Sequence, residues 1–172
     1  MLRGHEEAQK HIRLHQGGAA QNFHSPSAAP YLTGSGEVFL DVCEDLTRSG
    51  YDFFPDIAFE EPNDECLTKK ATASIFFDRL EYLYGVNSIE AATFEAAVFT
   101  YTKPQTITTL SMHAKMVCPF IIVNNRGRLY DNIALLLDDR DQLERLQKSC
   151  YEYARALHNG EYSVKQFLRL IE

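Results

Sequence analysis

The chain has 172 residues, of which 45% are hydrophobic and 24% are charged, and its formal net charge is −7 at neutral pH. These values are ordinary for a globular protein of one domain, and they exclude a chain that is disordered throughout. An acidic balance is unlike the basic face of a nucleic-acid-binding protein. No stretch has the roughly 18 uncharged apolar residues of a membrane span. We therefore expect neither nucleic acid nor a membrane span to be involved.

The four cysteines are widely separated along the chain, at Cys43, Cys66, Cys118 and Cys150, and they form no C-x-x-C pair. This spacing favours neither a zinc site nor a disulfide framework, so we expect no bound metal. Free thiols are typical of a reducing compartment, and the first residues lack the apolar stretch of a signal peptide. We therefore expect a cytoplasmic protein.

Composition divides the chain into two parts. Residues 1–21 are mostly polar and predict an N-terminal arm, whereas residues 22–172 predict one folded domain. Strands and helices alternate through most of that domain. In order, we expect a strand ending at His24, a helix over 36–49, a strand over 52–60, a helix over 63–71, a strand over 73–78, a helix over 86–94, a strand over 97–101, an ambiguous connection over 102–117 that can hold one helical stretch, and a strand over 119–123.

The last third of the chain is predicted to be helical. Gly50 is placed to end the helix over 36–49, Asp139 to cap a long amphipathic helix and Gly160 to end it. Ser163 and Gln166 form a capping box for a terminal helix. Apolar strands that alternate with helices are typical of an α/β domain, here a single Rossmann-like domain with a mostly parallel sheet and helices on both faces.

Open α/β sheets bind ligands beyond the carboxyl ends of their strands, where the strand order reverses. The loops after His24, Glu60, Asp78 and Tyr101 are the candidates. The loop after Asp78 leads to Gly85 and then directly to a helix, whose free N–H groups suit a phosphate. Glu90, one turn inside, can accept hydrogen bonds from a ribose. The alternative interpretation is an ordinary strand–loop–helix turn with a solvated glutamate.

Several segments resemble, in order and spacing, the donor-binding C-terminal half of retaining GT-B glycosyltransferases, the broad class related to glycogen and sucrose synthases. The resemblance covers about residues 22–172. The segments that carry it are H-S-P-S at 24–27, G-S at 34–35 with the helix that follows, A-S-I-F-F-D at 73–78, Y-G-V-N-S-I-E-A-A at 84–92, and the closing helices over 129–171.

The resemblance implies half of a GT-B fold that binds the nucleoside diphosphate of a sugar donor. No other cofactor is implied, and catalysis in such enzymes occurs between two Rossmann-like halves. A glutamate at the position of Glu90 holds the ribose in this family. The binding residues that we transfer to this sequence are Thr33, Gly34, Tyr84, Gly85, Val86, Asn87, Ser88 and Glu90. We assign no catalytic residue.

The departures from the family are as informative as the match. Thr33 stands near the position of the lysine that neutralises the diphosphate, and Tyr82 stands at the position of a glutamate that contacts the sugar. Glu95 replaces the glycine that follows the helix. Lys69 and Lys70 are expected to be solvated, and they are among the few cations that could replace the missing lysine. The 21 residues of the arm are too few for an acceptor half.

Two functions remain open at this point. The first is a degenerate donor half that acts as a scaffold or interaction module and binds a protein partner or a second copy of itself. The alternative is the donor-binding subunit of a split glycosyltransferase, with its acceptor half on another chain. Catalysis in this class depends on positioning two substrates in a closed cleft, so this chain alone is not expected to be active.

Overall fold

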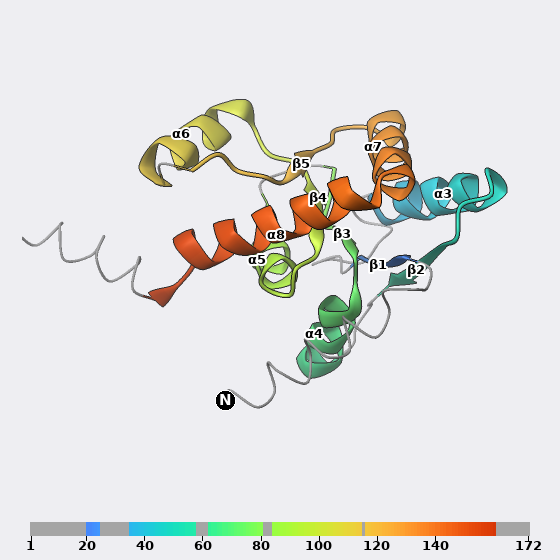
Figure 1. The fold of residues 1–172 in the computed structure, drawn as a ribbon, viewed down its shortest axis with the longest axis horizontal. Coiled ribbons are helices and arrows are strands. Elements are labelled where there is room, and N and C mark those ends of the chain that lie inside the picture. Colours follow the sequence, from blue (N-terminus) through green and yellow to red (C-terminus); the bar gives the residue numbers. More distant parts are fainter. Residues whose placement is uncertain (1–19, 25–34, 58–61, 81–83, 115, 161–172) are drawn as a thin grey trace, which may run out of the picture.

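A computed structural model describes residues 20–24, 35–57, 62–80, 84–114 and 116–160 (Figure 1). Its strands are β1 (Ala20–His24), β2 (Phe53–Ile57), β3 (Ile75–Phe77), β4 (Ala97–Thr100) and β5 (Ile121–Ile122). Its helices are α3 (Ser35–Arg48), α4 (Asn63–Thr72), α5 (Val86–Thr93), α6 (Pro104–Ala114), α7 (Arg126–Asp138) and α8 (Arg140–Leu157). None of the described helices is both long enough and apolar enough to cross a membrane.

The five strands form one sheet in the order β2-β1-β3-β4-β5, and every neighbouring pair is parallel. This architecture confirms the predicted α/β class with a parallel sheet. The chain leaves β1 towards β2 on one side and returns to β3 on the other, so the strand order reverses between β1 and β3. The two edges are β2, where Pro55 lies opposite Asn22, and the two-residue strand β5.

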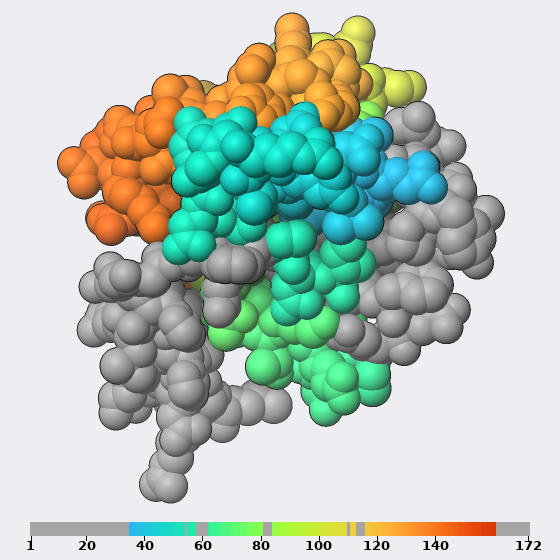
Figure 2. All heavy atoms as spheres, turned by 90° about the vertical axis from the view of Figure 1, so that its right-hand side faces the viewer, coloured from blue at the N-terminus to red at the C-terminus, as the bar shows by residue number. Residues whose placement is uncertain are grey.

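Successive side chains of the central strands enter two separate cores. Ile75 and Phe77 face α3 and α7, where Phe77 stacks on Phe39 with ring centroids 5.3 Å apart. Phe76 points to the opposite face and packs with residues of α5 and α8. Each of these aromatic rings is fully buried, and full burial of such a side chain contributes about 1.5–3 kcal/mol. Helices therefore cover both faces of the sheet, and α3 and α7 lie side by side on one of them (Figure 2).

Two helices end in the same hydrogen-bonded motif. After α3, the N–H of Gly50 donates to Thr47 and the N–H of Tyr51 donates to Leu46, with Gly50 at a φ of 91°. After α5, the residue in the equivalent left-handed position is Glu95, with a φ of 64°. Both are Schellman endings, in which glycine is the usual residue. The predicted role of Gly50 is confirmed, and Glu95 occupies a conformation that disfavours a side chain.

The C-terminal third matches the predicted helices with one correction. Asp139 caps α8 as expected, because its side chain accepts a hydrogen bond from the N–H of Gln142. Gly160, however, does not end α8. The helix ends at Leu157, where His158 leaves the helical conformation and the Asn159 side chain donates to the carbonyl of Arg155. The capping box at Ser163 and residues 1–19 of the predicted arm lie outside the described residues, whereas Ala20 and Gln21, the last two residues of that arm, belong to β1.

All four cysteines are free thiols. Cys43 and Cys150 are buried in the two cores, and burial raises the pKa of each thiol to about 12. Cys66 and Cys118 are partly exposed. The two buried thiols therefore act as small apolar side chains at neutral pH.

Candidate functional site

The candidate site lies where the strand order reverses, at the carboxyl ends of β1 and β3. Asp78 and Arg79 follow β3 directly, and Gly85 is the N-terminal cap of α5. The N-terminus of α3 lies at the same edge, because the N–H of Leu80 donates to the hydroxyl of buried Ser35 over 3.2 Å. His24 and Asp78, after which two of the four candidate loops begin, thus lie at this point.

The Asp78 carboxylate occupies the N-terminus of α5. Its Oδ2 accepts hydrogen bonds from the Ser88 hydroxyl at 2.6 Å and from the N–H of Gly85 at 3.3 Å. The side chain of Asp78 is 0% exposed. A helix N-terminus attracts negative charge because its first N–H groups have no partner within the helix. Here the protein itself provides that charge, at the position where the sequence suggested a phosphate.

Arg79 brings a cation to the same helix end, which the sequence analysis missed. Its Nε donates to Oδ1 of Asp78 over 3.2 Å. A Cβ built on Gly85 would lie 3.7 Å from Nη2 of Arg79, so the guanidinium group lies beside the cap of α5. Gly85 has a φ of −116°, which other residues also adopt. Neither the backbone nor Arg79 therefore requires glycine at this position.

The predicted ribose-binding residue is engaged in an ion pair. Glu90 Oε2 lies 2.7 Å from Nζ of Lys70, and the same ammonium donates to Oδ1 of Asn87 over 2.8 Å. The side chain of Lys70 is 1% exposed and that of Glu90 is 30% exposed. The expectation that Lys70 is solvated is therefore wrong, because α4 packs against α5 and encloses it. Lys69 remains partly exposed and pairs with Asp56 at 2.9 Å.

Tyr84 connects the site loop to the C-terminal end of α8. Its hydroxyl lies 3.1 Å from the hydroxyl of Tyr153, and its ring meets those of Phe120 and His158 edge to face. Burial raises the pKa of Tyr84 and of Tyr153 above the usual value of 10. Tyr84 thus packs as part of the core that α5 and α8 share.

The structure gathers the predicted residues of the α5 segment. Tyr84, Gly85, Asn87, Ser88 and Glu90 lie around the first turns of α5, and Val86 is 72% exposed beside them. Thr33 and Gly34 lie outside the described residues. Asp78 and Arg79 belong to the same neighbourhood although they were not among the predicted binding residues. Lys70, which was named as one of the few cations that could replace the missing lysine, lies there too.

Thr102 adds an unusual feature to this edge of the sheet. It lies two residues beyond β4, and it is 0% exposed. Its hydroxyl has no hydrogen-bond partner among the described residues. A buried polar group without a partner costs about 1–3 kcal/mol. This hydroxyl is therefore a local source of instability near the carboxyl ends of the strands.

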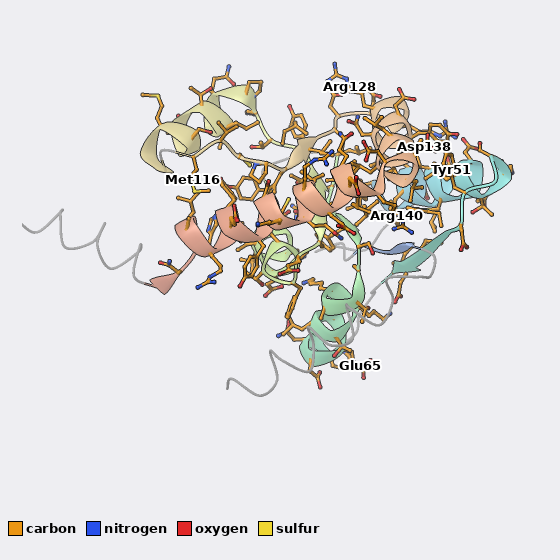
Figure 3. The ribbon with its side chains drawn as sticks, in the orientation of Figure 1. Tyr51, Glu65, Met116, Arg128, Asp138 and Arg140 are labelled. Carbon is orange, nitrogen blue, oxygen red and sulfur yellow. The ribbon has the colours of Figure 1, made fainter. Side chains whose placement is uncertain are left out.

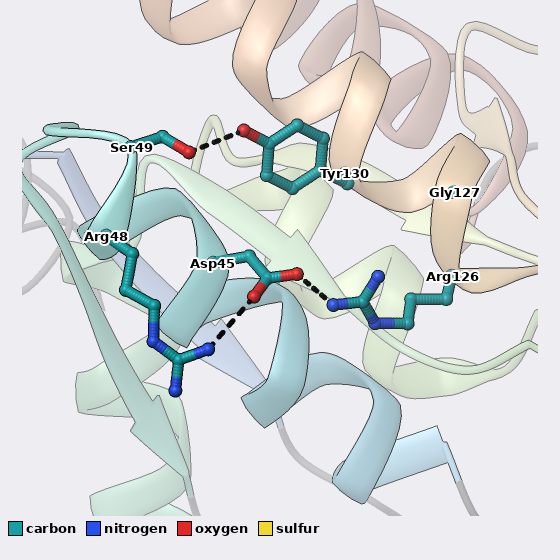
Figure 4. A pocket seen from close by; sticks show the side chains of 6 residues that line it. All are labelled: Asp45, Arg48, Ser49, Arg126, Gly127 and Tyr130. Carbon is teal, nitrogen blue, oxygen red and sulfur yellow. Dashed lines mark hydrogen bonds and ion pairs between the residues drawn. The ribbon is translucent and has the colours of Figure 1, made fainter.

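A hollow lies between α3 and α7 (Figure 4). It has a volume of about 360 Å³, and its lining residues are Asp45, Arg48, Ser49, Arg126, Gly127 and Tyr130. Asp45 bridges the guanidinium groups of Arg48 and Arg126, and Ser49 and Tyr130 share a hydrogen bond of 2.9 Å.

Beyond the end of α3, Tyr51 donates to Asp138, the last residue of α7, over 3.0 Å, and the two side chains lie together in Figure 3. Glu44 also pairs with Arg48 at 2.8 Å. The charges around the hollow are therefore satisfied by one another, and together with the Tyr51 contact they fasten α3 to α7.

The comparisons with known proteins include a likeness to a solved structure. The chain is similar to a solved structure described as the glycotransferase of kitacinnamycin, with a TM-score of 0.47 and 15% sequence identity. The match covers 90% of this chain and 46% of that one, so the chain spans less than half of that protein. No family model and no curated protein sequence matches the chain.

Proposed function

We propose that the chain is a glycosyltransferase-like donor unit that no longer binds a nucleotide sugar and acts as a scaffold or interaction module. The ion pair between Glu90 and Lys70 is the observation that carries this proposal. The residue that resemblance assigns to the ribose is instead committed to a buried ammonium at 2.7 Å. Asn87, another residue assigned to the donor, holds the same ammonium.

The cost of releasing this pair explains why it argues against a ribose. Removing one partner of a buried ion pair leaves an uncompensated charge in a low-dielectric environment and destabilises a protein strongly. A sugar diol that took Glu90 away from Lys70 would leave the ammonium, 1% exposed, with Asn87 as its remaining acceptor among the bonds described above. The pair is better suited to holding α4 against α5 than to receiving a ligand.

An alternative function is the donor-binding subunit of a split glycosyltransferase, with the acceptor half on another chain. Arg79 favours it, because its guanidinium group lies beside the cap of α5. Arginine suits phosphate geometry, so Arg79 could serve in place of the lysine that the sequence lacks near Thr33. Either function requires a second protein: a scaffold partner or second copy in the first case, and an acceptor subunit in the other.

A thermal-shift titration separates the two functions. The purified chain is heated with UDP, GDP, ADP and their sugars, beside the isosteric variant Glu90→Gln. A ligand at one hundred times its dissociation constant stabilises by about 2.7 kcal/mol, which raises the melting temperature of a chain of this size by about 5–10 °C. The module predicts no shift in either protein. A shift in the unmodified chain that Glu90→Gln abolishes would overturn it and establish a live donor site.

The module also predicts association through protein contacts. Sedimentation of the purified chain at several concentrations tests for self-association. A cross-linking pull-down with the unmodified chain and with a surface-charge variant such as Arg48→Glu then tests for a partner on the α3–α7 side. A strictly monomeric chain that binds a nucleotide sugar contradicts the module on both counts.

A further inference from the structure

We infer that Asp78 is the residue that excludes phosphorylated ligands from the switch point of the sheet, by acting as a built-in anion at the N-terminus of α5. The inference rests on the proposed function, because it explains how a donor-type site became closed to its ligand. It uses observations that are independent of the Glu90–Lys70 pair.

The contacts of Asp78 are those that an oxyanion would make at a helix N-terminus. One oxygen accepts from the N–H of Gly85 and from the Ser88 hydroxyl, and the other accepts from Arg79. A backbone N–H at a helix cap, a hydroxyl and a guanidinium form a set of donors that suits phosphate. The carboxylate of Asp78, the residue after β3, has taken this donor set, and its side chain is 0% exposed.

The cation beside the cap of α5 is already paired. Arg79 contacts the Asp78 carboxylate at 3.2 Å. A phosphate group would meet Asp78 at short range in a site partly shielded from water, where like charges repel most strongly. The chain as a whole is acidic, with a net charge of −7, and it adds no attraction.

Neutralising Asp78 should reverse this exclusion. Asp78→Asn keeps the size of the side chain and an oxygen that can accept from Ser88, but it removes the charge that Arg79 contacts. The N-terminus of α5 and the guanidinium group then face the site without an internal anion. We expect this variant to bind inorganic pyrophosphate, the part of a nucleotide sugar that needs no recognition of base or sugar.

The experiment is a calorimetric titration of inorganic pyrophosphate into the full chain at fixed ionic strength. It compares the unmodified chain with Asp78→Asn, with the matched control Ser88→Ala, and with Asp78→Asn/Arg79→Gln. The control removes a partner of the same oxygen without changing any charge. We expect Asp78→Asn to bind about tenfold to a hundredfold more tightly than the unmodified chain, as a charge-assisted bond allows. Ser88→Ala should resemble the unmodified chain, and the double variant should lose the gain.

Two results with pyrophosphate would overturn the inference. One is an Asp78→Asn variant that unfolds cooperatively, and is therefore folded, yet binds pyrophosphate no better. The other does not depend on Asp78→Asn: it is saturable pyrophosphate binding by the unmodified chain that a folded Arg79→Gln variant abolishes. Nucleotide-sugar binding by the unmodified chain that depends on Glu90 would overturn both this inference and the proposed function. Failure of the proposed function alone gives a different signature, namely a chain that neither self-associates nor captures a partner while Asp78→Asn still gains affinity for pyrophosphate.

Discussion

The ion pair between α4 and α5 predicts an asymmetric response to mutation. Glu90→Ala leaves the ammonium of Lys70, which is 1% exposed, with Asn87 as an acceptor. Breaking a buried ion pair costs about 3–5 kcal/mol. The partial exposure of Glu90, 30%, and the retained bond to Asn87 reduce our expectation to about 2–3 kcal/mol. For a chain of this length, that lowers the melting temperature by about 4–12 °C.

Replacing the lysine of the pair should destabilise the chain less than replacing the glutamate. Lys70→Met fills the same space with an apolar side chain and leaves a carboxylate that can turn to water, so we expect a loss of about 1 kcal/mol or less. The double variant Lys70→Met/Glu90→Ala removes both charges and should be more stable than Glu90→Ala alone. Urea unfolding of all four proteins gives the interaction energy, provided that the denaturant slopes agree. Equal losses in the two single variants, or a double variant at the sum of both, would refute this reasoning.

Three further predictions follow from local geometry. Glu95→Gly should stabilise the chain by about 0.5–1 kcal/mol and Gly50→Ala should destabilise it by about 1–2 kcal/mol, because both residues have a positive φ. Urea unfolding measures both changes. A lower free energy of unfolding for Glu95→Gly would contradict the view that the backbone of Glu95 is strained. Thr102→Val should raise the free energy of unfolding by about 1 kcal/mol, since it removes a buried hydroxyl that has no hydrogen-bond partner among the described residues. A lower melting temperature for this variant would mean that the hydroxyl does have a hydrogen-bond partner. Burial raises the pKa of Tyr153 above 10, so the folded state holds this proton more tightly than the unfolded state, and stability is lost as the pH rises beyond 10. Tyr153→Phe should lessen that alkaline loss in melting temperatures measured between pH 9 and 11, and an unchanged slope would contradict it.

The architecture could be predicted from the sequence because its signals are local. Alternating apolar strands and helical stripes predicted the parallel sheet, and single residues such as Gly50 and Asp139 predicted helix ends that the structure confirms. The predicted end of α8 was wrong because the prediction relied on Gly160 as the residue that stops the helix. The helix instead ends three residues earlier, at Leu157.

The site was harder to predict because its contacts join distant segments. Lys70 meets residues 17 and 20 positions further along the chain, and only the packing of α4 on α5 makes it buried. Nothing in the local sequence indicates that Lys69 is partly exposed while its neighbour Lys70 is buried. Arg79 was missed because the resemblance directed attention to a cation before α3. A basic residue directly after the strand at the switch point was the available signal.

The edges of the sheet restrict how the chain can associate with other proteins. Exposed edge strands are templates for pairing with a strand from another chain, which is a common route to aggregation and to peptide capture. In the described part of the sheet, one edge is β2, where Pro55 lacks an N–H group, and the other is β5, which has two residues. Neither edge offers a long ladder of backbone donors and acceptors. A partner is therefore expected to bind side chains on helical surfaces, and peptide libraries designed to add a strand are the wrong reagents with which to look for it.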